Sequence, residues 1–488
     1  MIHLPRPWRG RRLRRQADRD LELIRASELF DPYWYLATYP DVASSGQDPY
    51  VHYFMYGGKE GRHPGPRFDS HHYLLENPEV ERAGLNPLLH YLRHGRAEGR
   101  RSTPVGAFSI FDARPELAPL PLHYRRGGRP RVTLVTESTS PEYLFGGVMT
   151  SLVLAVLWAE RLGATVRLVT RSSPPDLSRV GAVLTASGVA PAPDIDAVQL
   201  PPRSSLASAD LTDEDVFLTT SWWTTRATLG SVPAGQVVYL LQEDERLFYP
   251  GGDSRLRCQE VLDEPALRFA VNTELLHRHL AGSGAPNVAT AGAWFEPSFP
   301  SPLYHPREHE GQRRRFAFYA RPKNLRNLYE RGLEVVVEAI EQGVLSPQEW
   351  EFIFFGSPPD SVILPRGVRP TYNSQLLLTE YAELLGTVDL GLALMYSPHP
   401  SYPPLDLAAS GAVVVTNRFA GKESLSMYSD NILVGGASTE ELVNLLAQGA
   451  ALAADRPRRA ANYGNSQLPR DWRASTRSLL EWLTSRVD

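Results

Sequence analysis

Residues 397–417 read SPHPSYPPLDLAASGAVVVTN, and this stretch predicts a loop, a short helix and a buried strand in immediate succession. The loop is interrupted by prolines and carries three polar or aromatic side chains, His399, Ser401 and Tyr402. Prolines cannot continue a helix interior, so the loop is expected to end where the small residues begin.

The small residues at about 404–409 predict a short helix with Asp406 in its first turn, and Gly411 predicts its end. Residues 412–416 are apolar and mostly β-branched, which is typical of a buried parallel strand. A loop and a helix N-terminus at the carboxyl edge of a doubly wound sheet are suited to binding an anion. The rest of the chain is consistent with two such sheets and an N-terminal appendage.

The composition is that of a globular protein of about three domains. The chain has 488 residues, of which 42% are hydrophobic and 22% are charged. The net charge of −4 gives no reason to expect nucleic acid as a partner. The single cysteine, Cys258, excludes an intramolecular disulfide and fits a reducing compartment.

The sequence has no apolar run near the roughly 18 residues that a membrane span needs. Residues 151–159 form one of the longest apolar runs, and the first residues lack the apolar centre of a signal peptide. We therefore expect a cytoplasmic protein, with peripheral contact at the inner face of the cell membrane as an alternative.

That alternative depends on a basic N-terminal arm, residues 1–29. Seven arginines crowd its first nineteen residues, namely Arg6, Arg9, Arg11, Arg12, Arg14, Arg15 and Arg19. Such a segment could bind anionic lipid, at about 1 kcal/mol per basic residue near the surface. We favour the simpler interpretation of a disordered, solvated arm.

Residues 30–104 contain two copies of a 38-residue repeat. Fourteen residues of the first copy recur at this fixed offset: Phe30, Asp31, Tyr35, Leu36, Pro40, Val42, Gly46, Pro49, His52, Tyr53, Gly57, Glu60, Gly61 and Arg62. Each copy predicts two short helices separated by a proline turn. The repeated His52 and His90 lack further ligands at metal-binding spacing in both copies, so we interpret them as packing residues.

After a linker at 105–130, residues 131–299 predict the first Rossmann-like domain. Strands are expected at 132–136, 166–170, 216–220, 237–241 and 268–271, and a helix at about 148–162. The pair Gly146 and Gly147 precedes that helix, where glycines let a ligand approach the backbone. A simple tight turn is the alternative.

Residues 300–470 predict the second Rossmann-like domain. Its expected strands are 316–320, 351–355, 389–394 and 412–416, and its expected helices lie at about 328–342 and 377–385. A last helix at about 472–486, within the segment 471–488, is expected to pack back on the first domain.

Three cations follow the first strand of the second domain. Arg321, Lys323 and Arg326 lie within six residues, between a strand end and a helix N-terminus. Arginine offers a bidentate fork and lysine a point charge, which suits a diphosphate that gains negative charge as it leaves. A solvated helix cap is the alternative, although three neighbouring cations would then repel one another.

The chain resembles GT-B glycosyltransferases, and in particular the WsaF-like bacterial rhamnosyltransferase family. The resemblance lies in YLFGGVMTSL (143–152), YLLQEDERLFYPGG (239–252), FAVNTELL (269–276), FYARPKNLRN (318–327) and the stretch 397–417. These motifs extend over about residues 130–470. The expected fold class is therefore α/β: GT-B, with two facing Rossmann-like domains, a parallel sheet in each, and a small N-terminal α-helical region.

The resemblance implies transfer of L-rhamnose from dTDP-β-L-rhamnose to a growing bacterial surface glycan, with no resident cofactor. We also expect no divalent metal, because Arg321, Lys323 and Arg326 can neutralise the diphosphate and the strand ends of the second sheet carry no Asp-x-Asp pair. Possible partners are then a nucleotide-sugar donor and a glycan acceptor, which could be lipid-linked. The implied donor-binding residues are Arg321, Lys323, Arg326, Asn327, Gly356, Ser357, Ser401, Tyr402 and Asp406. Gly146 and Gly147 would lie at the interdomain cleft, on the acceptor side.

The chain departs from the family pattern at one important place. Many retaining members carry two glutamates here, whereas this chain has Pro398 and Asp406. Asp406 could still reach the ribose, and the sugar-side role would pass to His399 and Ser401. Glu243 and Glu245 are candidates for binding acceptor hydroxyls or for the base. Together these give the predicted catalytic set His399, Asp406, Glu243 and Glu245.

Simpler structural roles remain open for two of these residues, since His399 could pack the loop and Asp406 could cap the helix. Two other functions also remain open. A silent GT-B scaffold, whose helical repeat binds a partner, would explain the missing glutamate. A nucleotide-sugar epimerase would share the diphosphate site.

Overall fold

The computed structural model describes residues 11–103, 110–125, 127–140, 146–190, 195–202, 207–359 and 361–485. The predicted arm residues Arg6 and Arg9 lie outside these ranges. Two compact units are present. Unit 1 comprises residues 1–125 and 202–211, and unit 2 comprises residues 126–201 and 212–488.

Unit 1 begins with a helix where the sequence analysis favoured a disordered arm. Helix α1 spans Arg11–Arg25 and buries Ala17, Leu21 and Ile24 on one face. Ile24 is part of the same apolar core as the repeat. The spacing of these three residues is helical, so the interpretation of this segment as disordered was wrong for residues 11–25.

The two repeats of unit 1 adopt matching structures. The helices are α2 (Pro32–Thr38), α3 (Pro40–Ser45) and α4 (Pro49–His52) in the first copy, and α5 (Ser70–Glu76), α6 (Pro78–Arg82) and α7 (Pro87–His90) in the second. Each copy continues into a π-helical turn, Tyr53–Gly57 or Tyr91–Gly95. Nδ1 of His52 lies 3.0 Å from the hydroxyl of Tyr35, and Nδ1 of His90 lies 2.9 Å from that of Tyr73. The histidines therefore pack against tyrosines, as predicted.

Unit 1 ends with helix α8 (Ile110–Ala113) and strand β1 (Leu122–Tyr124). Strand β1 pairs in parallel with β5 (Ala209–Leu211), a later segment of the chain that also belongs to unit 1.

The first sheet of unit 2 has seven strands in the order β4-β3-β2-β6-β7-β8-β9, and all neighbouring pairs are parallel. The strands are β2 (Arg131–Thr136), β3 (Thr165–Thr170), β4 (Ile195–Gln199), β6 (Asp215–Thr219), β7 (Val237–Leu241), β8 (Arg268–Asn272) and β9 (Gly292–Phe295). Its helices are α9 (Gly147–Leu162), α10 (Leu177–Ala186), α11 (Trp222–Leu229), α12 (Asp253–Leu262), α13 (Glu274–Gly282) and α14 (Pro286–Ala291).

The second sheet has six strands in the order β12-β11-β10-β13-β14-β15, again parallel throughout. The strands are β10 (Arg314–Ala320), β11 (Trp350–Gly356), β12 (Thr371–Ser374), β13 (Leu390–Leu392), β14 (Val413–Asn417) and β15 (Ile432–Gly435). Its helices are α15 (Tyr329–Glu341), α16 (Leu378–Gly386), α17 (Tyr402–Ala409), α18 (Thr439–Ala454) and α19 (Arg456–Gly464). The predicted α/β fold with two parallel sheets is confirmed.

Alternate residues of the central strands face opposite sides of the second sheet. Phe316 and Phe318 of β10 pack in one apolar core with side chains of α15 and α18. Ala317 belongs to a second core, which also contains α17 residues and extends to β2 and α9 of the first sheet. A continuous core therefore runs through both halves of unit 2 and supports the carboxyl edges of both sheets.

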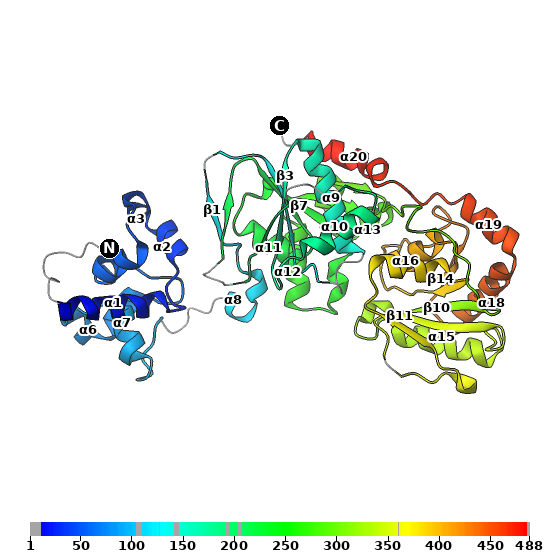
Figure 1. The fold of residues 1–488 in the computed structure, drawn as a ribbon, viewed down its shortest axis with the longest axis horizontal. Helices are drawn as coiled ribbons and strands as arrows, with labels where there is room; N and C mark the ends of the chain where they lie inside the picture. Colours follow the sequence, from blue (N-terminus) through cyan, green and yellow to red (C-terminus); the bar gives the residue numbers. More distant parts are fainter. Residues whose placement is uncertain are drawn as a thin grey trace. The chain divides into compact units, whose positions relative to one another are not determined.

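The last helix, α20 (Trp472–Thr484), returns to the first sheet. It lies beside α9, as Figure 1 shows. Arg473 pairs with Glu160 of α9 at 2.5 Å, and the carbonyl of Leu483 accepts a hydrogen bond from Arg268. The chain thus crosses between the two sheets at two places, near residues 296–303 and 468–472.

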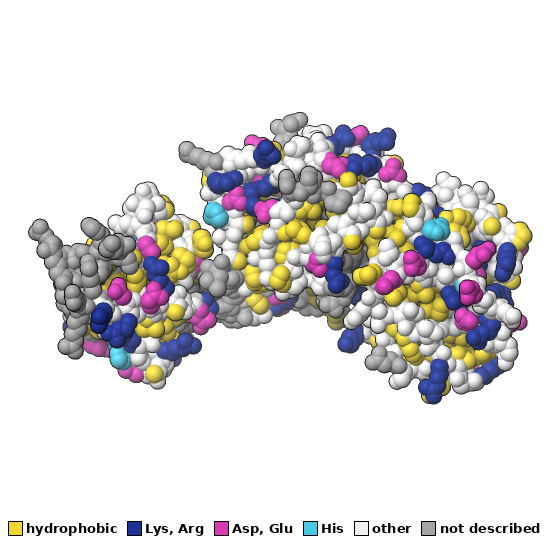
Figure 2. Space-filling view, in the orientation of Figure 1, with side chains coloured by type: hydrophobic (Ala, Val, Ile, Leu, Met, Phe, Trp, Pro, Cys, Tyr) yellow, Lys and Arg dark blue, Asp and Glu magenta, His cyan; other side chains and the backbone are white. Residues whose placement is uncertain are grey.

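In the part of the chain that the structure describes, no helix is long and apolar enough to cross a membrane. On the face drawn in Figure 2, acidic and basic side chains are interspersed over unit 2. This mixed surface agrees with the small net charge of the sequence.

Candidate functional site

The carboxyl edges of the two sheets of unit 2 meet, and side chains of one half contact the other. Arg326 Nη1 donates to Glu243 Oε2 at 2.5 Å, and Ser397 Oγ donates to Glu243 Oε1. Carboxyl edges are where α/β sheets bind ligands. We call Glu243, Arg326, Ser397, His399 and Lys422 the junction cluster, because contacts or charges link all five.

The predicted diphosphate cations lie at the carboxyl end of β10. Arg321 Nη1 donates to the hydroxyl of Tyr319 at 3.4 Å, and the side chain of Lys323 is exposed. Arg326 is held more firmly, because its guanidinium also lies 4.1 Å from the centre of the Phe248 ring. Through Glu243 and Phe248, Arg326 therefore connects the second sheet to the segment that follows β7 of the first sheet.

The predicted donor-binding residues Gly356 and Ser357 lie beside these cations. The N–H of Ser357 donates to the carbonyl of Ala320 at 2.9 Å, which joins the ends of β11 and β10. Gly356 has a φ of 105°, and a Cβ there would lie 2.9 Å from Tyr319 and 3.2 Å from Cγ of Arg321. Glycine is therefore required for the close approach of these two strand ends.

Asn327 follows Arg326 in a 3₁₀ turn (Leu325–Asn327) before α15. Its amide Nδ2 donates to the sulfur of Met395 at 3.4 Å. Its Oδ1 is buried and has no hydrogen-bond partner among the described residues. A buried acceptor without a partner is uncommon, so Asn327 is available for a ligand donor.

His399 is buried with an exposed fraction of 3%. Its Nδ1 accepts a hydrogen bond from the N–H of Ser401 at 2.9 Å, so the neutral ring carries its proton on Nε2. Burial, together with the charges of Lys422 and Arg326, lowers the pKa of His399 to about 3. Nε2 has no partner among the described residues, which leaves a neutral hydrogen-bond donor.

Ser401 and Tyr402 join the loop to α17. Ser401 has a φ of 71°, a left-handed conformation that is strained for a residue with a side chain. The Tyr402 hydroxyl contacts Thr150 of α9 and lies 2.6 Å from Nδ2 of Asn272 at the end of β8. Tyr402, which was predicted to bind the sugar donor, thus connects the two halves of unit 2.

The predicted glycine loop contacts protein side chains. A Cβ on Gly146 would lie 3.1 Å from the Tyr402 ring, and one on Gly147 would lie 3.1 Å from Nε2 of Gln242. Gln242 also donates to the carbonyl of Gly147 at 2.8 Å. Small residues are needed at both positions so that β7, α17 and the start of α9 can meet.

The carboxylates after β7 have three different environments. Burial raises the pKa of Glu243 despite the nearby charge of Arg326. Burial raises the pKa of Glu245 to about 7, and this carboxylate accepts the N–H of Trp222 at 2.8 Å. For Asp244, burial is outweighed by hydrogen bonds from His279 and Arg246, which lower its pKa.

Asp406 is bound by tyrosine hydroxyls in the interior. Tyr381 donates to Oδ2 of Asp406 at 2.9 Å, and the hydroxyl of Tyr304 also interacts with this carboxylate. Burial raises the pKa of Asp406 to about 7. The predicted ribose contact stays a prediction, and a test is described in the Discussion.

Lys422 was missed by the sequence analysis. It follows β14, and its side chain is fully buried. Its Nζ lies 3.5 Å from the carbonyls of both Met395 and His399. The signal that could have found it is its position after the carboxyl end of a parallel strand, which is the same rule that identified Arg326. Ser397 was quoted in the motif but was assigned no role.

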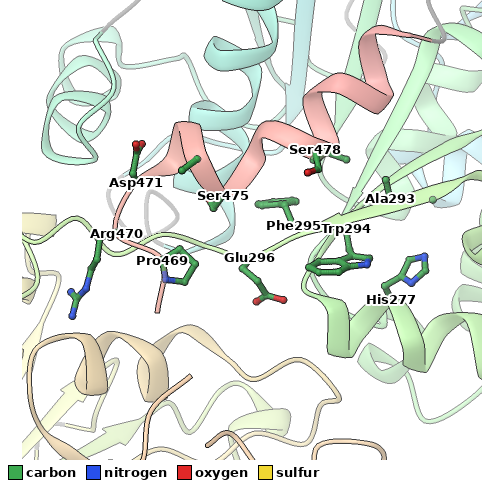
Figure 3. A pocket seen from close by; sticks show the side chains of 13 residues that line it. His277, Ala293, Trp294, Phe295, Glu296, Pro469, Arg470, Asp471, Ser475 and Ser478 are labelled. Carbon is green, nitrogen blue, oxygen red and sulfur yellow. The ribbon is translucent and has the colours of Figure 1, made fainter. Parts of the chain in front are cut away.

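A cavity of about 780 Å³ lies elsewhere in unit 2, between β9 and α20. Figure 3 shows Trp294 and His277 side by side on one wall, with Ser475 and Ser478 on α20. None of the predicted site residues lines this cavity. The candidate site is therefore the sheet junction and the adjacent end of β10, not the cavity.

We compared the sequence and the structure with those of known proteins. Residues 314–447, which include the second sheet, match the family model described as WsaF, C-terminal domain. The structure is similar to that of Anabaena HepE in complex with UDP and glucose, with a TM-score of 0.51 and 13% identity, over 72% of this chain and 99% of that chain. The chain has the GT-B fold, with two parallel sheets.

A second HepE structure, in complex with UDP-glucose, also aligns to this GT-B chain with a TM-score of 0.51 and 13% identity, over 73% of this chain and 99% of that chain. The O-antigen biosynthesis protein RfbC of Myxococcus xanthus is 28% identical over 280 residues. That alignment covers 55% of this chain and 20% of RfbC, so the chain spans about a fifth of that relative's length.

Proposed function

We propose that this protein is a glycosyltransferase that transfers L-rhamnose from dTDP-β-L-rhamnose to a growing bacterial surface glycan. The observation that supports this most strongly is the placement of Arg321, Lys323 and Arg326 at one strand end, within the segment similar to the WsaF C-terminal domain. A surface-glycan acceptor is suggested by the similarity to an O-antigen biosynthesis protein.

In this proposal the three cations hold the diphosphate and stabilise its growing charge as the glycosidic bond breaks. Gly356 and Ser357 lie beside them and would contact the nucleoside. Neutral His399 would donate from Nε2 to a sugar hydroxyl. Each role uses the geometry found at the ends of β10, β11 and β13.

Glu245 is the better candidate for the base that takes the proton of the acceptor hydroxyl. Its pKa of about 7 suits proton transfer near neutral pH, because a base works best when its pKa is close to the working pH. Glu243 is already bonded to Arg326 and Ser397, so it is less available as a base.

The donor assay tests the proposed activity. The protein is incubated separately with dTDP-rhamnose, UDP-glucose and GDP-mannose, and nucleotide release is followed without acceptor. We expect slow release of dTDP from dTDP-rhamnose and much less from the other donors. Absence of release from all three would favour a silent scaffold, and interconversion of the sugar without release would favour an epimerase.

Turnover is expected to be independent of divalent metal. The diphosphate charge is balanced by fixed cations in this proposal, and no group of three metal-binding side chains occurs among the described residues. Full activity after dialysis against chelator and in excess EDTA is the expected result. Loss of activity that Mg²⁺ or Mn²⁺ restores would contradict it and would direct attention to Glu243, Asp244 and Glu245.

A further inference from the structure

Arg326 is paired in the structure. Its guanidinium lies between the Glu243 carboxylate, at 2.5 Å, and the ring of Phe248, at 4.1 Å from its centre. Both partners belong to the first sheet's connection after β7, whereas Arg326 belongs to the second sheet. Any diphosphate that binds Arg326 must therefore compete with Glu243 or share the guanidinium with it.

Glu243 has other groups that can stabilise its charge. Ser397 donates to Oε1, while Arg326 contacts only Oε2. Glu243 is almost fully buried, with an exposed fraction of 7% for the whole residue. Departure of Arg326 would leave a buried anion, which is costly unless another cation compensates it.

Lys422 is placed to supply that compensation. Its side chain is fully buried, and within the described residues it forms no ion pair; the carbonyls of Met395 and His399 lie 3.5 Å from Nζ. Burial lowers the pKa of Lys422 to about 8, and attraction to Glu243 acts in the opposite direction. The junction cluster thus holds two cations and one anion.

We propose that Arg326 is an exchangeable cation, which pairs with Glu243 in the free protein and transfers to the donor diphosphate, while Lys422 remains as the counter-charge of Glu243. This inference rests on the proposed function. Among the described residues only Nη1 of Arg326 contacts a carboxylate, so the guanidinium has further donors to offer to a phosphate.

The exchange couples the two sheets to donor binding. When Arg326 moves to the diphosphate, Oε2 of Glu243 loses its partner and can accept a hydrogen bond from a hydroxyl of the acceptor. The Tyr402 contacts with Thr150 and Asn272 do not involve Arg326 and would keep the sheets together. Lys422 is a positioning residue in this scheme, because it acts through Glu243.

Glu243→Gln tests the competition directly. Removal of the charge frees Arg326, so the dissociation constants of dTDP and UDP, measured by calorimetry on the full chain, should fall about tenfold. Glu296→Gln is the matched control, because Glu296 is a carboxylate at the end of β9 whose partners are the N–H of Glu274 and the hydroxyl of Tyr428. The control should bind both nucleotides as the wild type does.

The Arg326→Ala background separates exchange from simple removal of a negative charge. There, Glu243→Gln should change the dissociation constants by less than about twofold, because the exchanging cation is gone. A tenfold gain that persists in this background would overturn the proposal, as would unchanged binding in the single variant Glu243→Gln.

Lys422→Met tests the counter-charge. We expect nucleotide binding to weaken about tenfold in Lys422→Met and to recover in the double variant with Glu243→Gln, because a neutral residue 243 needs no counter-charge. Thermal unfolding checks that each variant folds. If Lys422→Met does not fold, the binding measurements on the Glu243→Gln variants still decide whether the exchange occurs. Failure of the folded double variant to recover would assign Lys422 a merely structural role.

Nucleotide binding to the wild type separates the cation exchange from the proposed function. Binding of dTDP or UDP to the wild type, with no gain in Glu243→Gln, would overturn the exchange and leave the proposed function intact. Absence of nucleotide binding in the wild type and in every variant would overturn both.

Discussion

Arg326→Ala is expected to lower donor turnover by about 10²–10³-fold, as for the loss of one transition-state charge partner. The residue lies at the carboxyl end of β10, in a short 3₁₀ turn rather than in either apolar core, so the fold should survive. Turnover is measured as nucleotide release from dTDP-rhamnose, and thermal unfolding is measured in parallel.

A matched control is available five residues further along the chain. Arg331 lies in α15 and contacts Thr439 and Glu334, outside the junction cluster. Arg331→Ala should leave turnover within about twofold, because surface ion pairs contribute little. Near-normal turnover in folded Arg326→Ala would exclude Arg326 as a diphosphate ligand.

The loss of turnover has to be separated from the effect on Glu243. In Arg326→Ala this buried carboxylate loses its ion pair, which by itself should lower the stability. The double variant with Glu243→Gln removes the unpaired charge and should recover stability without recovering turnover. A recovery of both would mean that Arg326 serves mainly to neutralise Glu243.

The central strands could be predicted from the sequence because they are buried on both faces. The expected strands 132–136, 237–241, 316–320 and 351–355 are confirmed within two residues at each end as β2, β7, β10 and β11. Continuous apolar runs in these segments reflect helices packed on both sides of a parallel sheet. The expected strand at 412–416 is likewise found, as β14.

Four strands of unit 2 were missed, namely β4, β9, β12 and β15, and each is the outermost strand of its sheet. An edge strand is covered less completely, so its residues need not be uniformly apolar. In β12 the end residues Thr371 and Ser374 are exposed, and in β4 only half-buried or exposed residues occur. Hydrophobic periodicity therefore carries little signal at these edges.

The sequence predicted which strand ends carry the candidate site residues, but it did not predict which of these residues contact one another. The rule that ligands bind at carboxyl edges selected Arg326, and the family resemblance selected Glu243. Their direct pairing could not be foreseen, because they are 83 residues apart and belong to different sheets, so their contact depends on how those sheets dock. Lys422 was missed for a related reason, since a single lysine in a loop gives no pattern before its burial is known.

Asp406→Asn is expected to change the pH dependence of stability. The carboxyl group of Asp406 is buried, its hydrogen bonds come from tyrosine hydroxyls, and burial raises its pKa to about 7. In the unfolded chain the pKa of an aspartate is about 3.9. Between these values the folded protein keeps a proton that the unfolded chain releases, so the stability contributed by Asp406 is lost as the pH rises through this window.

Asparagine cannot titrate, so the variant lacks this loss of stability. The unfolding free energy of Asp406→Asn minus that of the wild type should therefore increase from pH 5 to pH 8, by about 2–3 kcal/mol. Urea unfolding at several pH values measures the difference. Glu245 also has a raised pKa, but its contribution is present in both proteins and cancels.

Asp176→Asn is the matched control, because the carboxylate of Asp176 caps α10 and hydrogen bonds from Ser178 and Arg179 lower its pKa. Asp176 is therefore ionised throughout pH 5–8, and its variant should differ from the wild type by a constant amount. A pH-independent difference for Asp406→Asn as well would show that Asp406 is ionised in the folded protein. A weakened affinity for dTDP in a stably folded Asp406→Asn protein would support the predicted ribose contact. In that case the tyrosine hydroxyls would have to release the Asp406 carboxylate when the nucleotide binds.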